Sequence, residues 1–298
     1  MISEIKKAIK NKLPGPLFDI LVSLYRFTLF YPVLLFRSFY LFLFFRKKTI
    51  ITLKETALKL VVNPKNGYTD RMLFLFKERD IDLIKFMRQN VQPTDTIVDI
   101  GANIGYETIW GASLVPQGRV YSFEPLPNLV KQIEESIHTN GFTNVELKNK
   151  AVGNTSGEIT LFLNPKDAGL TSARSKEGAT STAQVPIIKL DEELKNIGAI
   201  SFIKMDIEGH EFDAFLGAKT LLEKYHPTIV FEFSPHLYEL DYPGKSKELL
   251  KFLIQLDYAI YVLGTQEKIK NEDSALETFI QHTIKKGGHS DIIASVNK

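Results

Sequence analysis

The sequence predicts an α/β fold in which a mostly parallel β-sheet is covered by helices on both faces. From Thr49 onward, short apolar runs alternate with longer polar segments that have helical spacing. Strand–helix–strand units of this kind pair their strands in parallel and pack their helices on the sheet. The chain has 298 residues, 44% of them hydrophobic and 24% charged, which is enough for one large core.

An apolar segment precedes this pattern. Arg37 is the single charge between residues 27 and 45, which would form a helix of about 28 Å, close to the roughly 30 Å core of a bilayer. We therefore predict that residues 1–48 form hydrophobic, membrane-associated helices, which would hold the protein on the cytoplasmic side of a membrane. The alternative is a pair of helices whose apolar faces cover the domain or a partner subunit. Residues 49–92 then lead into a core domain at 93–298.

The elements of the core are expected in regular succession. Residues 49–62 predict one or two strands, and residues 80–90 predict a helix. Further strands are expected at Thr96–Ile100, Arg119–Phe123, Val145–Lys148, Ser201–Met205, Thr228–Phe233 and Tyr258–Leu263. Helices are expected at Tyr106–Leu114, Pro127–Asn140, Glu211–Lys224 and Ser246–Leu256. Residues 164–184, rich in small and polar side chains, predict a long loop, either a disordered insertion or a gate over a substrate.

Composition excludes several kinds of chemistry. There is no cysteine, so disulfides, thiolate catalysis and cysteine-based zinc sites are ruled out. The formal net charge is +2 and the lysines are spread along the chain, which argues against nucleic acid as a partner.

A glycine-rich turn follows the strand predicted at residues 96–100. The strand ends near Asp99, and the turn Gly101-Ala102-Asn103-Ile104-Gly105 then opens a helix. The dinucleotide-binding fingerprint needs glycine at offsets 0, 2 and 5, and Asn103 and Tyr106 occupy the last two positions. A strand-terminal acid suits a cofactor that carries an amine, and the turn is expected to let that cofactor approach the backbone.

These residues resemble the first motif of class I S-adenosylmethionine-dependent methyltransferases. Glu124, at the end of the next strand, matches the acid that in such enzymes accepts hydrogen bonds from both ribose hydroxyls. More narrowly, the chain resembles the FkbM-type family in an ordered set of segments: DIGANIGYET (99–108), FEP (123–125), LDEEL (190–194), KMDIEGHE (204–211) and PTIVFE (227–232). The resemblance implies a Rossmann-like, doubly wound, mostly parallel sheet of seven strands. It also implies S-adenosylmethionine as cofactor, with contacts expected from Asp99, Gly101, Ala102, Asn103, Gly105 and Glu124.

The stretch KMDIEGHE carries the candidate catalytic residues Asp206, Glu208 and His210. Strand alternation would place Asp206 and Glu208 on one face, where they could hold a substrate hydroxyl. The base that takes the hydroxyl proton is left open between Asp206 and His210. Glu211 is expected mainly to begin a helix, where an acid offsets the helix dipole. No metal is expected, because two carboxylates without further certain oxygen ligands are too few for Mg²⁺ or Ca²⁺.

The resemblance implies an O-methyltransferase that acts on a hydroxyl of a sugar, glycolipid or polyketide-like small molecule. Two alternatives stay open. One is a non-catalytic, membrane-tethered binding module that keeps the fold, which the presence of Asp206 and Glu208 disfavours. The other is an NAD-dependent oxidoreductase, which Asn103 and Tyr106 disfavour. Within this sequence, Glu232 is a further charged residue on an apolar strand, expected to line the acceptor pocket.

Overall fold

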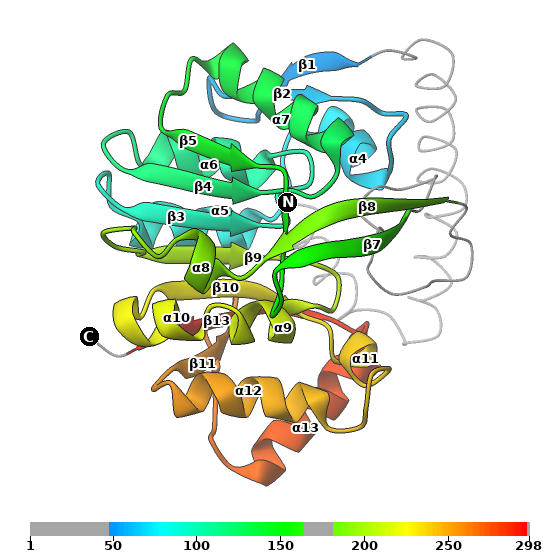
Figure 1. Cartoon of the computed structure of the whole chain (residues 1–298), viewed down its shortest axis with the longest axis vertical. Helices are drawn as coiled ribbons and strands as arrows, with labels where there is room; N and C mark the ends of the chain where they lie inside the picture. Colours follow the sequence, from blue (N-terminus) through cyan, green and yellow to red (C-terminus); the bar gives the residue numbers. More distant parts are fainter. Residues whose placement is uncertain (1–47, 164–180, 297–298) are drawn as a thin grey trace, which may run out of the picture. The chain divides into compact units, whose positions relative to one another are not determined.

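A computed structural model describes residues 48–163 and 181–296 (Figure 1). The predicted membrane segment and most of the predicted loop lie outside these residues. In the ranges described, no helix is both long and apolar enough to cross a bilayer.

The main sheet has eight strands in the described chain, in the order β12-β11-β13-β10-β9-β3-β4-β5. Its parallel part has five strands, which are β3 (Thr96–Ile100), β4 (Arg119–Phe123), β5 (Val145–Lys148), β9 (Phe202–Met205) and β10 (Thr228–Phe233). All four residues of β9 and the last four of β3 are buried, as expected of strands covered on both faces. The strand order reverses between β3 and β9, which is where open α/β sheets bind their ligands.

The other side of the sheet is antiparallel. The late strand β13 (Ser290–Ser295) lies between β10 and β11 (Ala259–Val262), antiparallel to both. A two-residue edge strand, β12 (Lys268–Ile269), pairs with β11 and raises the expected seven strands to eight. The predicted fold class is confirmed, with this difference in strand number.

Helices connect these strands and cover the sheet. They are α4 (Tyr68–Phe76), α5 (Ile81–Asn90), α6 (Tyr106–Leu114), α7 (Pro127–Asn140), α8 (Leu190–Glu193), α9 (Glu211–Leu216), α10 (Lys219–Tyr225), α11 (Pro235–Tyr238), α12 (Lys245–Gln255) and α13 (Asp273–Lys286). The helix predicted at residues 211–224 is divided in two at Gly217. A Cβ on Gly217 would lie 2.0 Å from the carbonyl oxygen of Gly153. The helix is therefore interrupted where the backbones of Gly217 and Gly153 are in contact.

Two smaller sheets complete the described structure. Strands β1 (Thr49–Thr52) and β2 (Lys59–Val62) form an antiparallel pair. Strands β6 (Ala151–Val152), β7 (Gly157–Leu163) and β8 (Ser181–Ile188) form a sheet in the order β6-β8-β7. Figure 1 shows β7 and β8 projecting beyond the edge where β3 and β4 end. The end of the predicted loop, residues 181–184, is therefore strand and not loop, because it pairs with β7.

Candidate active site

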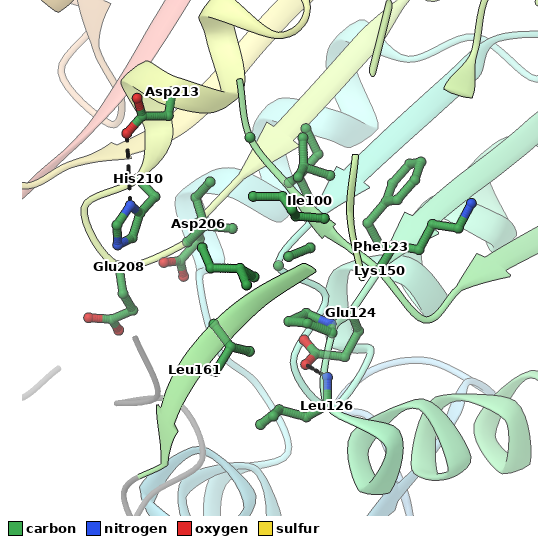
Figure 2. Close-up of a pocket in the computed structure, with 18 of the residues that line it drawn as sticks. Ile100, Phe123, Glu124, Leu126, Lys150, Leu161, Asp206, Glu208, His210 and Asp213 are labelled. Carbon is green, nitrogen blue, oxygen red and sulfur yellow. Dashed lines mark hydrogen bonds and ion pairs between the residues drawn. The ribbon is translucent and has the colours of Figure 1, made fainter. Parts of the chain in front are cut away.

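A cavity of about 250 Å³ lies at the carboxyl ends of β3, β4 and β9 (Figure 2). We call it the first cavity. Three segments that were singled out separately in the sequence meet in its wall: the glycine-rich turn, the end of β4 and the segment after β9. Of the predicted site residues, six line it: Gly101, Asn103, Glu124, Asp206, Glu208 and His210. In Figure 2 the last three lie together on one side of the cavity, across from Glu124.

The turn after β3 needs left-handed backbone at three positions. Gly101 has φ 78°, Asn103 φ 54° and Gly105 φ 87°. Asparagine tolerates this region better than most residues, which explains why Asn103 can stand where the motif often has glycine. A Cβ on Gly101 would lie 1.9 Å from the carbonyl oxygen of Asp206. We expected a cofactor to approach the backbone of this turn closely. In this structure the backbone of Asp206 makes that close approach, so the turn packs against the segment that carries the candidate base.

Glu124 is buried and holds the turn from the side of β4. Its Oε2 accepts a hydrogen bond from the backbone N–H of Asn103 at 2.8 Å, and its Oε1 accepts one from Leu126 at 2.9 Å. Burial raises the pKa of Glu124 to about 7, although both hydrogen bonds favour the charged form. Each oxygen has a second lone pair for a further donor. The predicted contact with two ribose hydroxyls is therefore chemically compatible with this placement.

Three of the predicted cofactor contacts do not line the first cavity. Ala102 and Gly105 belong to the turn but are buried and do not line the cavity. Asp99 is 1% exposed, and its Oδ2 accepts a hydrogen bond from Thr108 Oγ1 at 2.5 Å. Lys204 Nζ lies 3.6 Å from Asp99 Oδ1 and donates to the carbonyl oxygen of Gly101 at 3.1 Å. The structure thus places Asp99 in a buried ion pair that fastens the turn to β9, and a direct contact with a cofactor amine stays a prediction.

The candidate catalytic residues follow β9 on a turn instead of an extended strand. Glu208 has φ 55° and Gly209 φ 94°, so the chain curls after Ile207. Asp206 and Glu208 still line one cavity, but through this turn and not through the strand alternation we expected. His210 Nδ1 lies 3.9 Å from Asp213 Oδ2, an ion pair if the imidazole is protonated. Within residues 48–163 and 181–296, His210 Nε2 is buried without a hydrogen-bond partner.

Glu211 does more than begin α9. The side chain is 1% exposed, and Oε1 accepts hydrogen bonds from the backbone N–H groups of Ile207 at 2.9 Å and Gly209 at 3.4 Å. Tyr238 donates its hydroxyl hydrogen to Oε2 at 2.9 Å. Burial raises the pKa of Glu211 to about 7. Glu211 therefore fixes the turn that carries Asp206 and Glu208, a role that the helix-dipole interpretation missed.

The apolar wall of the first cavity was also missed. Ile159 and Leu161 on β7 and Ile187 on β8 face the cavity, and the segment from Lys150 to Thr155 closes one end. Alternate apolar residues at 159, 161 and 163 could have revealed strand β7. An apolar wall opposite a carboxylate suits a ligand with a flat ring at one end and a diol near it.

A second cavity, of about 410 Å³, lies on the other side of Asp206. It is lined by strand ends and by the segment before α5, and its charged side chains are Arg79, Asp80, Asp82, Lys204, Asp206, Glu232, His289 and Asp291. Glu232 thus lines the same cavity as the candidate base Asp206, and its contact with an acceptor stays a prediction. Asp206 is shared by both cavities. In the described ranges, no three His, Asp or Glu side chains are arranged to hold a metal ion.

The first cavity fits S-adenosylmethionine in its chemistry. Glu124 offers acceptors to ribose hydroxyls, the wall from β7 and β8 offers apolar contact to a purine, and the turn at Gly101 and Asn103 lies between them and Asp206. These residues would hold the cofactor with its reactive end toward the segment after β9.

Comparison with known proteins agrees with this assignment. Residues 99–260, just over half of the chain, match the family model of the methyltransferase FkbM domain. Hexuronic acid methyltransferase AglP of Haloferax volcanii is 24% identical over 198 residues, which cover 62% of this chain and 80% of that protein. Methyltransferase 1 of Beauveria bassiana is 24% identical over 147 residues, 42% of this chain and 59% of that protein.

Among solved structures, methyltransferase FkbM from Methylobacillus flagellatus KT has a TM-score of 0.46 at 17% identity, over 73% of this chain and 48% of that one. The family assignment rests on the sequence match and on the motifs that line the first cavity. The chain belongs to the FkbM methyltransferase domain family, and it is an enzyme whose methyl donor is S-adenosylmethionine.

Proposed function

We propose that this methyltransferase transfers its methyl group to a hydroxyl oxygen of a sugar or a similar polyhydroxylated small molecule. The observation that supports this most strongly is the position of Asp206, which lines both the first and the second cavity. A base there lies between the donor site and the space left for an acceptor. The name of the Haloferax volcanii relative, which acts on a hexuronic acid, supports an acceptor of the sugar class.

When bound, S-adenosylmethionine supplies an electrophilic methyl group whose carbon–sulfur bond breaks as the new carbon–oxygen bond forms. The chain must position the acceptor oxygen and take its proton, and positioning accounts for much of the acceleration in such displacements. A carboxylate in reach of the acceptor hydroxyl accepts that proton as the oxygen attacks. Asp206 is our choice for this base, since His210 lines the first cavity only.

The hydrogen bonds of Glu211 and the contact with Gly101 support the choice of Asp206. Glu211 holds the backbone N–H of Ile207, and Gly101 leaves room for the carbonyl oxygen of Asp206 itself. The backbone of Asp206 is therefore held from two sides, which general base catalysis requires of a residue that must meet a hydroxyl at hydrogen-bond distance.

The test compares Asp206→Asn with His210→Asn in methyl transfer to an acceptor pool. Asp206→Asn is expected to lower turnover by about 10² to 10⁴, the usual contribution of a general base. Its affinity for S-adenosylhomocysteine, measured by isothermal titration, should stay close to that of the wild type. Full activity of Asp206→Asn with loss in His210→Asn would move the base to the imidazole.

We also propose that residues 1–48 hold the enzyme at the cytoplasmic side of a membrane. The support is composition alone, because residues 27–45 carry one charge and are flanked by lysine and arginine on both sides.

A further inference from the structure

The second cavity differs from the first in its charge. Five carboxylates line it, against two permanently charged cations, Arg79 and Lys204, and one histidine. With His289 neutral, the wall carries a formal charge of three negative units. The five acids come from four separate segments of the chain: Asp80, Asp82, Asp206, Glu232 and Asp291.

Both cations already have partners within the protein. Arg79 Nε lies 2.7 Å from Asp80 Oδ2, and another guanidinium nitrogen donates to Thr69 at 2.9 Å. Lys204 is held by Asp99 and by the carbonyl oxygen of Gly101. Nε and Nη1 of Arg79 and Nζ of Lys204 are therefore already engaged within the protein.

Two of the acids face each other across a strand pair. Glu232 on β10 is the register partner of Asp291 on β13, and like charges directly opposite each other destabilise a sheet. Ser234 donates one hydrogen bond to Glu232 at 2.7 Å. Partial loss of hydration at the cavity wall, together with Asp80 and Asp206, raises the pKa of Asp291 to about 6, although the residue as a whole is exposed to solvent. Two opposed carboxylates destabilise the sheet, and they lie in a cavity wall beside the proposed base Asp206. An unfavourable pair at such a place is more often explained by ligand binding than by folding.

The acids are spread too widely for a metal ion. No cluster of three potential ligands is present in the described part of the chain, so the wall is not a cation cage. Carboxylates spaced around a cavity instead suit several hydroxyl groups, because each oxygen accepts hydrogen bonds and donates none. A carboxylate on the ligand would be repelled by the net negative charge of the wall.

We propose that the second cavity binds the methyl acceptor as a neutral sugar or similar polyol and rejects uronic acids. The inference rests on the proposed function, since it takes the acceptor to lie on the far side of Asp206. It separates this enzyme from the Haloferax volcanii relative, which is named for a hexuronic acid.

The experiment uses the full-length protein and S-adenosylmethionine labelled in its methyl group. The acceptor pool is the glycan and glycolipid extract of the organism that makes the protein. Mild acid first releases glycans from lipid phosphates, and alkali then removes label from any methyl ester while leaving methyl ethers intact. Anion exchange finally separates neutral from acidic sugars.

Label that survives alkali and elutes with the neutral sugars is the expected result. Alkali-labile label, or stable label in the acidic sugars, would overturn the inference while leaving the methyltransferase assignment in place. A protein that binds S-adenosylhomocysteine but labels no pool would overturn the proposed function, and the inference with it.

Matched variants test the cavity wall directly. Glu232→Gln and Asp291→Asn should each lower kcat/KM for the neutral acceptor by about tenfold, as expected for loss of a hydrogen bond to a charged group. Glu267→Gln, an exposed acid outside both cavities, is the control. Affinity for S-adenosylhomocysteine should not change in any of them. Transfer rates equal to that of Glu267→Gln would show that the wall does not touch the acceptor.

Discussion

Gly101→Ala is the change that most directly tests how the active site is built. Gly101 has φ 78°, and an added Cβ would lie 1.9 Å from the carbonyl oxygen of Asp206. Gly141 offers a matched control, since it has φ 68° with nothing within 4 Å of an added Cβ. Both variants place an alanine in left-handed backbone, and only in Gly101→Ala does the added Cβ also clash with another part of the chain.

The magnitude follows from these two contributions. Left-handed backbone costs an alanine roughly 1–2 kcal/mol relative to glycine, so Gly141→Ala should lose about that much unfolding free energy. In Gly101→Ala the carbonyl oxygen of Asp206 must move by on the order of 1 Å to restore contact distance, and overpacking of this kind costs a further ~1–3 kcal/mol. A shift of that size at a catalytic residue can lower turnover by about 10²-fold.

Urea unfolding gives the free energies of both variants, and labelled methyl transfer gives their turnover. We expect Gly101→Ala to be the less stable of the two and to lose most of its activity, while Gly141→Ala stays active. The reasoning is refuted if the two variants lose the same stability and keep the same turnover, because the turn would then not be seated against Asp206.

Two further predictions come from the described structure, and a third comes from the composition of residues 1–48. Since burial raises the pKa of Glu124 to about 7, its carboxyl gains a proton as the pH falls from 8 to 6; affinity for S-adenosylhomocysteine should then fall by roughly tenfold, and Glu124→Gln should remove this pH dependence in isothermal titration. Tyr238→Phe deprives the Glu211 carboxylate of its hydroxyl donor and should lower unfolding free energy by about 1–3 kcal/mol. Tyr258→Phe is its control, since that hydroxyl is buried without a hydrogen-bond partner in the described residues, and equal losses would count against the role of Tyr238. Deleting residues 1–48 should move the protein from the membrane pellet to the supernatant, and a deletion variant that stays in the pellet would contradict the membrane proposal.

The parallel half of the fold could be predicted from sequence because its strands are buried on both faces. Strands β3, β4, β5 and β10 begin and end where the apolar runs predicted. Helix α13 was missed, and strand β13 was missed because it pairs between two strands that precede it in the chain. Such a pairing depends on contacts that are distant in sequence, and no local pattern reports it.

Six of the nine predicted site residues line the first cavity, because the end of a parallel strand places its next few residues at a known edge. The roles of Asp99 and Glu211 could not be found in this way. The sequence predicts a cofactor contact for Asp99 and mainly a helix start for Glu211, and only the structure shows that Lys204 pairs with Asp99 and that Tyr238 donates to Glu211. A motif indicates that a residue matters, whereas burial and partners decide whether it touches the ligand.

The wall of the second cavity has a consequence for how acceptor choice can change within the family. The matched family region is 99–260, and it contains every described residue of the first cavity. Much of the second cavity comes from outside it, from residues 79–83 on one side and from Leu263, His289 and Asp291 on the other. If the second cavity binds the acceptor as proposed, donor binding and acceptor binding depend on different stretches of the chain. Under that proposal, exchanging the two flanks is expected to change the acceptor while the residues that line the first cavity stay the same.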